Sequence, residues 1–254
     1  MPTSSDNAFA DKVVLVTGGT AGIGRATAVA FARQGAKVVV SGRRKTEGLE
    51  SVALVEKAGG EGLFVRADVS QEEDVAALIA TTVERFGRLD IAFNNAGVIE
   101  RGPITDITVE SYEHIFGINV RGVALGLKHQ IAAMLKTGGG SIVNNASVLG
   151  IRPYPELSLY NASKFAVIGL TKTAALEYAT KGIRVNAVCP AIIETDMTAM
   201  ARDDEQTRNA LLVTHPVRRF GTPEEVADAV LWLSSPVSGF ITGINLPVDG
   251  GFTV

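Results

Sequence analysis

Residues 13–25 read VVLVTGGTAGIGR, a β-branched run followed by a glycine-rich turn and the start of a stretch with helical spacing. The run is almost continuously apolar, as in strands that are covered on both faces. A strand, a glycine turn and a helix N-terminus in this order present backbone N–H groups and the positive end of a helix dipole to a phosphate. The spacing Gly-x-x-x-Gly-x-Gly differs from the Gly-x-Gly-x-x-Gly fingerprint. A tight turn that only packs a helix against a strand is therefore the alternative interpretation.

The same pattern of strand and helix repeats along the chain. β-branched runs predict seven strands, at residues 13–17, 37–41, 63–67, 89–93, 141–146, 184–188 and 244–248. Helical spacing predicts helices at residues 22–34, 71–86, 111–135, 158–179 and 223–233. The alternation implies right-handed βαβ crossovers, so we expect one α/β domain over residues 1–254, a Rossmann-type doubly wound parallel sheet with helices on both faces. The mixed-charge stretch 191–222 interrupts the pattern and is predicted to be a lid over the substrate.

The composition narrows the classes of partner. The 254 residues carry a formal net charge of −3, whereas a nucleic-acid surface needs a basic excess, so we expect no nucleic-acid partner. Residues 1–11 lack the basic and apolar regions of a signal peptide, and no apolar run of about 18 residues occurs, so we expect no membrane segment. The single cysteine, Cys189, cannot form an intrachain disulfide, and a cytoplasmic location is expected.

The end of the second predicted strand bears on which dinucleotide the chain would bind. An NAD site usually has an Asp or Glu about 20 residues past the glycine turn, where it accepts from the ribose hydroxyls. Here that position reads Ser41-Gly42-Arg43-Arg44, without a carboxylate. Two guanidinium groups are suited to pair with a 2′-phosphate, so the sequence favours NADP(H), with NAD(H) as the second option. The alternative is that the two arginines form a solvated surface loop.

Three polar residues follow the fifth predicted strand. Tyr160 and Lys164 are four residues apart, so on a helix they share one face. A nearby ammonium favours the phenolate and is expected to lower the phenol pKa from its usual value of about 10, which suits a general acid or base. Ser147 lies just past the strand, at the sheet edge where ligands bind in open α/β folds, and its hydroxyl can hold a substrate oxygen. A Tyr-x-x-x-Lys pair alone also occurs on exposed helices, so the inference depends on all three residues.

Taken in order along the chain, the motifs resemble those of the short-chain dehydrogenase/reductase family. They are Thr17-Gly18-x-x-x-Gly22-x-Gly24, Asn94-Asn95-Ala96-Gly97, Asn119, Ser147, Tyr160-x-x-x-Lys164 and Pro190-x-x-x-x-Thr195, and they cover nearly the whole chain. Each motif alone is weak evidence, but the ordered set is specific. The resemblance implies a Rossmann fold that binds a nicotinamide dinucleotide.

The resemblance also implies a role for each matching residue. The catalytic residues would be Asn119, Ser147, Tyr160 and Lys164: the serine orients the substrate oxygen, the tyrosine transfers the proton, and the asparagine joins a relay through the lysine. The dinucleotide would be bound by Gly18, Thr20, Gly22, Ile23 and Gly24 at the diphosphate, Ser41, Arg43 and Arg44 at the 2′-position, Asp68 and Val69 at the adenine, Asn95, Ala96 and Gly97 beside the adenosine-side ribose, Tyr160 and Lys164 at the nicotinamide ribose, and Pro190, Ile193 and Thr195 at the nicotinamide. In such enzymes the hydride passes between nicotinamide and substrate, so the protein mainly positions and polarises.

Two positions depart from the family pattern. Ala191 stands where a glycine usually follows Pro190, and it would be strained if that position needs a positive φ. Asn145 stands where a hydroxyl or an aliphatic residue is expected, and the sequence assigns it no role. The three histidines are far apart in the sequence and have no ligand-like neighbours, so no metal site is predicted.

The favoured function is an NADP(H)-dependent oxidoreductase that interconverts a carbonyl and a secondary alcohol by hydride transfer, with Tyr160 as acid or base. A 3-oxoacyl thioester reductase is an alternative, and it needs a basic docking patch for a carrier protein, for which Arg121, Lys128 and Lys172 are candidates. An NAD-dependent alcohol dehydrogenase is a further alternative. A non-catalytic NADP-binding redox sensor is a remote one, because all four catalytic residues are present.

The residues between Ser147 and Tyr160 are largely apolar, which favours an uncharged or hydrophobic small-molecule carbonyl or alcohol. Core or subunit contacts are the other explanation for these residues. Arg152 is the exception in this stretch and could meet an anionic substrate group. The family resemblance implies a homo-oligomer, most often a tetramer. The sequence specifies neither the physiological substrate, nor the stereochemical preference, nor the direction of the reaction.

Overall fold

The core of the protein is a parallel sheet. This computed structural model describes residues 7–199 and 204–254, and within them seven strands form one sheet in the order β3-β2-β1-β4-β5-β6-β7. The strands are β1 (Val13–Thr17), β2 (Lys37–Gly42), β3 (Glu61–Arg66), β4 (Ile91–Asn94), β5 (Gly140–Asn145), β6 (Ile183–Pro190) and β7 (Asn245–Val248). All neighbouring strands pair in parallel, which confirms the predicted doubly wound sheet.

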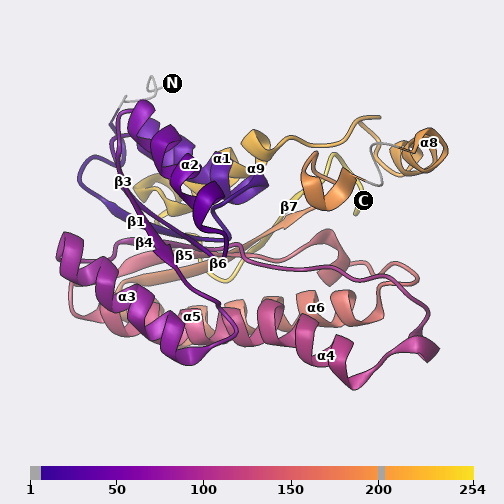
Figure 1. Cartoon of the computed structure of the whole chain (residues 1–254), viewed down its shortest axis with the longest axis horizontal. Helices are drawn as coiled ribbons and strands as arrows, with labels where there is room; N and C mark the ends of the chain where they lie inside the picture. Colours follow the sequence, from indigo (N-terminus) through magenta and orange to yellow (C-terminus); the bar gives the residue numbers. More distant parts are fainter. Residues whose placement is uncertain (1–6, 200–203) are drawn as a thin grey trace.

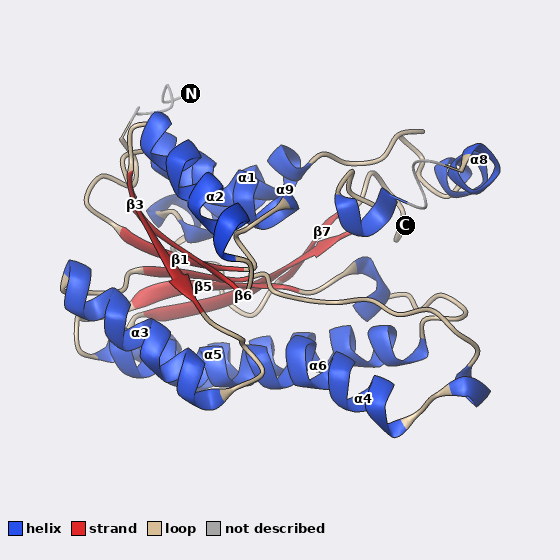
Figure 2. Cartoon of the chain, viewed as in Figure 1, coloured by secondary structure: helices blue, strands red, loops and turns tan. Residues whose placement is uncertain are grey.

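Helices cover both faces of the sheet, as Figures 1 and 2 show. One layer contains α1, α2 and α9, and the opposite layer contains α3, α4, α5 and α6. The helix bounds are α1 (Gly22–Arg33), α2 (Lys45–Lys57), α3 (Glu72–Phe86), α4 (Val109–Phe116), α5 (Gly122–Leu135), α6 (Ser158–Tyr178), α8 (Glu205–Val213) and α9 (Pro223–Ser234). Because each layer buries one face of the sheet, β1 is fully buried along its whole length.

The strand order reverses direction at β1, which has β2 on one side and β4 on the other. Connections from these two neighbours run to opposite faces of the sheet, so a crevice opens beyond the carboxyl ends of β1 and β4. The glycine turn follows β1, and the Asn94-Asn95-Ala96-Gly97 motif begins at the end of β4. The fold therefore brings these two motifs to the same edge of the sheet.

The long helix predicted over residues 111–135 is interrupted. Thr108 caps α4 by accepting from the backbone N–H of Ser111, and a π-helical segment, Gly117–Arg121, connects α4 to α5. Asn119 lies in this segment, and its side chain bonds elsewhere in the chain. Short π-helical segments inside α-helices are frequent at functional sites.

Two helices were missed by the prediction. The stretch that forms α2 has a weak apolar face, and Leu49 and Leu54 are 51% and 40% exposed there. Helix α8, which Asp204 caps, lies inside the predicted lid 191–222, and residues 200–203 of that lid lie outside the described residues. Strand ends also differ by one to two residues, as expected where a strand frays into a turn. Within the described ranges, no helix combines the length and the apolar character that spanning a bilayer requires.

Candidate active site

The glycine turn after β1 is closely packed against the loop after β4. Gly18 and Gly22 have φ values of +63° and +49°, which favour glycine. A Cβ on Gly24 would lie 2.3 Å from the carbonyl oxygen of Gly18 and 2.6 Å from Nδ2 of Asn95. Asn95 Nδ2 donates to the carbonyl oxygens of Thr17 and Gly18 at 3.1 and 3.0 Å. The turn is thus shaped by backbone approach that a side chain would prevent.

The N-terminus of α1 is free to bind an anion. Its N-cap residue, Ala21, provides no side-chain hydrogen bond, and the first turn of the helix carries no acidic residue. The backbone N–H groups of this turn and the helix dipole therefore remain available for a negative group. Together with the glycine contacts, this arrangement fits a dinucleotide diphosphate. Gly18, Gly22, Ile23 and Gly24 were predicted to bind this group.

The residues expected at the 2′-position lie together beyond β2. The guanidinium of Arg44 donates to Oγ1 of Thr20 at 3.2 Å and lies 3.3 Å from a carboxylate oxygen of Glu47. Arg43 is 3.9 Å from Asp68, which follows β3. The hydroxyl of Ser41 is buried and has no hydrogen-bond partner in the described part of the chain. Both arginines remain more than half exposed, so the site keeps two cations at its rim.

The loops after β3 and β4 supply the other adenosine-side candidates. Asp68 accepts from the backbone N–H and the hydroxyl of Ser70, and these bonds lower the pKa of its carboxyl against the opposing effect of burial. Val69 packs against the start of α5, where a Cβ on Gly122 would meet it. Oγ1 of Thr17 accepts from the N–H groups of Asn95 and Ala96. The predicted residues therefore lie in one row along the sheet edge.

Tyr160 and Lys164 share one face of α6, next to the end of β5. Nζ of Lys164 lies 5.4 Å from the ring centre of Tyr160. Burial raises the pKa of Tyr160 to about 12, against the lowering effect of the Ser147 side chain, and burial lowers the pKa of Lys164 to about 8. The predicted fall of the phenol pKa is therefore wrong for this structure, because burial raises it. Desolvation is the largest effect on the phenol. The ammonium of Lys164 donates to the carbonyl oxygen of Asn145 at 2.8 Å.

Asn119 fixes the loop that follows β4. Its Oδ1 accepts from Val98 N at 2.8 Å, and its Nδ2 donates to Val98 O at 2.9 Å and to Ser163 Oγ at 3.0 Å. Ser163 donates in turn to the carbonyl oxygen of Tyr160 at 2.7 Å. The side-chain amide of Asn119 therefore holds Val98 and Ser163 in place. The backbone of Asn119 is left to take part in the predicted proton relay. Sequence reasoning missed Ser163, although it lies inside the quoted Tyr-x-x-x-Lys motif.

The segment after β6 reaches back to the glycine turn. A Cβ on Gly22 would lie 3.1 Å from Cγ2 of Thr195, so these two residues are neighbours. The side chain of Ile193 is 3% exposed and belongs to the core, so only its backbone can face a nicotinamide. Pro190 ends β6, and its carbonyl oxygen lies 3.5 Å from Oγ of Ser147. The structure thus brings all the predicted regions to one edge of the sheet.

The comparisons with known proteins agree with this geometry. The sequence model of a family described as enoyl-(acyl carrier protein) reductase matches residues 18–253. A curated relative, 2,5-dichloro-2,5-cyclohexadiene-1,4-diol dehydrogenase of Sphingobium indicum, is 43% identical over 245 residues, which are 95% of this chain and 97% of that protein. The chain belongs to the short-chain dehydrogenase/reductase family.

Two solved structures resemble this short-chain dehydrogenase/reductase over almost their whole length. Levodione reductase has a TM-score of 0.93 at 38% identity and covers 96% of this chain and 98% of its own. The 3-ketoacyl-(acyl-carrier-protein) reductase from Brucella melitensis, complexed with NADH, has a TM-score of 0.91 at 35% identity and covers 97% and 100%. This short-chain dehydrogenase/reductase is an NAD(P)-dependent oxidoreductase that acts on CH–OH and C=O groups.

The two departures from the family pattern now have structural accounts. Ala191 is not among the residues with positive φ, so the alanine is unstrained, and its N–H donates to the carbonyl oxygen of Val248. Asn145 donates from Nδ2 to Oδ1 of Asn95 at 3.0 Å. Its role depends on a partner that is 50 residues away in the sequence, so no local pattern could have shown it.

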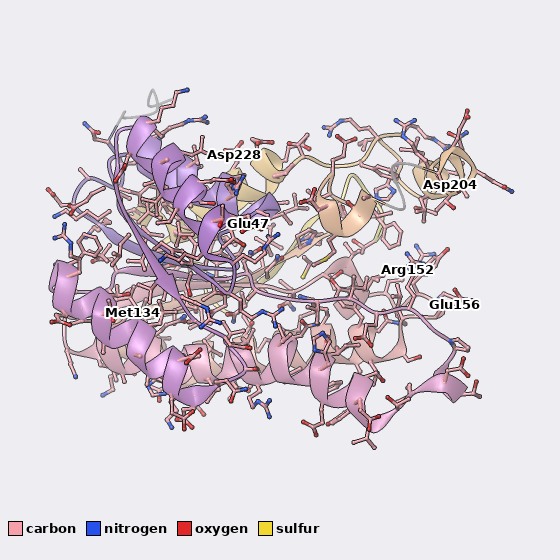
Figure 3. The ribbon with its side chains drawn as sticks, in the orientation of Figure 1. Glu47, Met134, Arg152, Glu156, Asp204 and Asp228 are labelled. Atoms are coloured by element: carbon pink, nitrogen blue, oxygen red, sulfur yellow. The ribbon has the colours of Figure 1, made fainter. Side chains whose placement is uncertain are left out.

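The C-terminal segment of this short-chain dehydrogenase/reductase contacts the loop between β5 and α6. Arg152 donates to the carbonyl oxygen of Phe252 at 3.2 Å, and its guanidinium lies 5.6 Å from the centre of that ring. Figure 3 shows Arg152 and Glu156 at the end of the molecule where the C-terminus and α8 also lie. Arg152 is thus engaged within the chain by Phe252. In residues 7–199 and 204–254, no three His, Cys, Asp or Glu side chains form a group that could hold a metal ion.

Proposed function

We propose that this enzyme is an NADP(H)-preferring dehydrogenase that interconverts a cyclic or otherwise apolar secondary alcohol and its ketone. The observation that carries the proposal is the placement of Ser147, Tyr160 and Lys164 around one point at the end of β5. That point lies beside the glycine turn and the loop after β4. The bound nicotinamide supplies or accepts the hydride.

The protein's own residues handle the substrate oxygen and the proton. Because the pKa of Tyr160 is raised to about 12, the phenol is protonated at neutral pH and can donate its proton to a developing alkoxide. The hydroxyl of Ser147 is available to hydrogen-bond the same substrate oxygen. Lys164 holds a positive charge close to the phenol and stabilises the phenolate that the transfer leaves. For alcohol oxidation the same groups act in reverse.

The preference for NADP(H) is supported by the two cations at the end of β2. Arg43 and Arg44 are the charged residues there, and each is balanced by a single carboxylate on one side only. A 2′-phosphate carries about two negative charges and can pair with both guanidinium groups. The relative from Brucella melitensis was crystallised with NADH, so NAD(H) is the competing cofactor that an experiment has to include.

The substrate class is supported by exposed apolar side chains near the end of β5 and by one relative. Ile151 and Tyr154 lie on the loop between β5 and α6 and expose 41% and 40% of their surface, while Met197 of the lid exposes 54%. These side chains are apolar or aromatic, and Arg152 among them is occupied by Phe252. The Sphingobium indicum relative is named for a ring diol. A cyclic secondary alcohol without charge therefore fits best.

Two of the three cations expected to dock a carrier protein in the thioester alternative lie beside carboxylates. Arg121 lies 4.0 Å from the carboxylate of Glu113, and Lys128 is paired with Glu72, which also receives a contact from His129. Two of the three candidate docking cations are thus neutralised within the chain. Docking of an acidic carrier protein would have to break these pairs.

The proposal includes a homotetramer in the cytoplasm. Phe240, Val237 and Val254 expose 105%, 85% and 101% of their surface, and Trp232 on α9 exposes 42%. Strand β7, one edge of the sheet, follows Val237 and Phe240 in the sequence and precedes Val254. Apolar side chains clustered at an uncovered sheet edge are typical of a subunit contact. The buried free thiol of Cys189 is compatible with a reducing compartment.

The proposed function is tested by assaying the purified enzyme with cyclohexanol, cyclohexanone and an acetoacetyl thioester, each with both cofactors. We expect turnover of the ring substrates, faster with NADP(H), and a loss of about 10²- to 10⁴-fold in kcat for Tyr160→Phe. Fluorescence titration with NADPH should give the same dissociation constant for Tyr160→Phe as for the wild type. Preference for the thioester, or full activity of Tyr160→Phe, would contradict the proposal.

A further inference from the structure

The orientation of the Asn145 side chain follows from its neighbours. Asn95 must point its Nδ2 at the carbonyl oxygens of Thr17 and Gly18, because these atoms only accept. Oδ1 of Asn95 therefore faces the opposite way, toward Asn145, and accepts from Nδ2 of that residue at 3.0 Å. This leaves Oδ1 of Asn145 as a buried acceptor without a partner in the described part of the chain.

The backbone of the same residue holds the catalytic lysine. Nζ of Lys164 donates to the carbonyl oxygen of Asn145 at 2.8 Å. The main chain at Asn145 is fixed by the sheet, since it is in register with Val188 of β6. Three hydrogen bonds, joined through the covalent framework of Asn95 and Asn145, thus connect the carbonyl oxygen of Gly18 to the ammonium.

Fold stability alone does not account for the amide. The hydrogen bond from Asn145 satisfies one buried acceptor, Oδ1 of Asn95. The same amide brings in a second buried acceptor, its own Oδ1, which has no donor in the described part of the chain. A buried acceptor without a partner costs free energy, so the amide moves this cost from one residue to the other instead of removing it. What the amide adds is a fixed geometry between the turn and the lysine.

We propose that Asn145 is a positioning residue that couples the diphosphate-binding turn to Lys164. Through Asn95 it ties the end of β5 to the turn, and through its own carbonyl oxygen it sets where the ammonium lies. Binding of the diphosphate then presents Lys164 to the nicotinamide-side ribose at the correct distance. This inference rests on the site assigned under the proposed function.

The experiment compares two cofactor fragments in calorimetric titrations of Asn145→Leu, which keeps the branching at Cγ but removes the amide. ADP contains the diphosphate and no second ribose, whereas ADP-ribose contains both. We expect ADP-ribose to bind about fivefold to tenfold more weakly to the variant, the effect of one displaced hydrogen bond. ADP should bind within about twofold of the wild type, because Asn95 still holds the turn. Equal losses for both fragments, or none for either, would overturn the proposal.

Two further variants separate this inference from its assumptions. Asn186→Leu removes a buried amide from the neighbouring strand β6, where Asn186 bonds the backbones of Ile241 and Ile244. It should lower the melting temperature without changing the ratio of the two fragment affinities. If Asn145→Leu does not fold, Asn145→Val is titrated in its place, because a β-branched residue suits a strand.

Lys164→Met tests the site itself. If this variant binds ADP-ribose as tightly as the wild type, the proposed role of Lys164 at the ribose is wrong, whatever Asn145→Leu does. If Lys164→Met weakens the binding of ADP-ribose and Asn145→Leu does not, only the proposed coupling through Asn145 is wrong.

Discussion

The ammonium of Lys164 lies 5.4 Å from the ring centre of Tyr160, and burial shifts both pKa values in the direction that favours the neutral form of each group. The phenol pKa rises to about 12 and the ammonium pKa falls to about 8. The other titratable group beside them is the thiol of Cys189, whose pKa burial raises to about 11 and which is itself influenced by Asp249. Among Tyr160, Lys164 and Cys189, the lysine is therefore the one that is charged at neutral pH, and its pKa is the closest of the three to neutral pH.

Ketone reduction should lose rate as the pH rises through about 8, where Lys164 loses its proton. Because the lysine pKa is lowered in the folded protein, the charge is present below this value and absent above it. The neutral amine no longer stabilises the phenolate left by proton transfer. A profile of kcat/KM for reduction against pH checks this. A flat profile between pH 7 and pH 10 would show that the lysine charge does not contribute.

Lys164→Met should make the protein more stable at neutral pH, although it lowers activity. Burial lowers the pKa of Lys164 from its usual value of 10.5 to about 8, so the charged form is disfavoured in the folded state. This cost is fully present below about pH 8, declines up to about pH 10.5 and is absent above it. We expect a gain of about 1 to 3 kcal/mol at pH 7, reduced by the lost bond to Asn145. Urea unfolding at pH 7 and pH 11 measures it, and an equal gain at both values would refute the explanation.

The sequence predicted the sheet because its strands are short, β-branched and separated by helical spacing, and these signals are local. It failed for α2, whose exposed leucines at positions 49 and 54 weaken the apolar face. It also joined α4 and α5 into one helix, since the π segment around Asn119 is imposed by bonds to Val98 and Ser163. Tertiary contacts of this kind leave no periodic trace in the sequence.

The positions of the candidate site residues were predictable from their order, but their electrostatics were not. A Tyr-x-x-x-Lys spacing places both groups on one helix face, and the structure does so. Spacing carries no information on desolvation, which is why the expected fall in the Tyr160 pKa is a rise instead. The functions of Asn145 and Ser163 depend on partners in other elements, and their residue types alone do not indicate them.

Gly24→Ala should abolish cofactor binding. The added Cβ would lie 2.3 Å from the carbonyl oxygen of Gly18 and 2.6 Å from Nδ2 of Asn95, so the turn has to move. Gly19→Ala in the same turn is the milder comparison, because its Cβ would lie 3.0 Å from Cγ1 of Val40 and 3.2 Å from the carbonyl oxygen of Val16, distances that shifts of a few tenths of an ångström relieve. NADPH fluorescence titration should show a loss above about 100-fold for the first and below about threefold for the second. Similar affinities for the two variants would mean that close approach at Gly24 is unimportant.

Phe240→Lys should disrupt an oligomer. The side chain of Phe240 is fully exposed in the single chain, and Val237 and Trp232 expose 85% and 42% close to it in the sequence. A lysine buried in an apolar contact is costly, so the variant should run as a smaller species. Size-exclusion chromatography with light scattering measures the mass. A wild type that elutes as a monomer would remove the proposed tetramer, and an unchanged mass for the variant would place the contact elsewhere.

Arg43→Ala and Arg44→Ala should each weaken NADPH binding by about tenfold and leave NADH binding almost unchanged. Only NADPH offers a 2′-phosphate for a charge-assisted bond. Arg44 is held by Thr20 and Glu47, and Arg43 faces Asp68. We therefore expect Arg44, which has a neutral anchor as well as a carboxylate, to be the better oriented of the two and to show the larger effect.

Arg33→Ala is the matched control for these two variants, because Arg33 is exposed in the last turn of α1, away from the diphosphate end. It removes the same charge without touching the site, so both affinities should stay at the wild-type value. Raised salt should weaken NADPH more than NADH in the wild type, and this difference should disappear in the Arg43→Ala, Arg44→Ala double variant. Tighter binding of NADH than NADPH to the wild type would assign the arginines to the solvated surface and make the enzyme an NAD-dependent alcohol dehydrogenase.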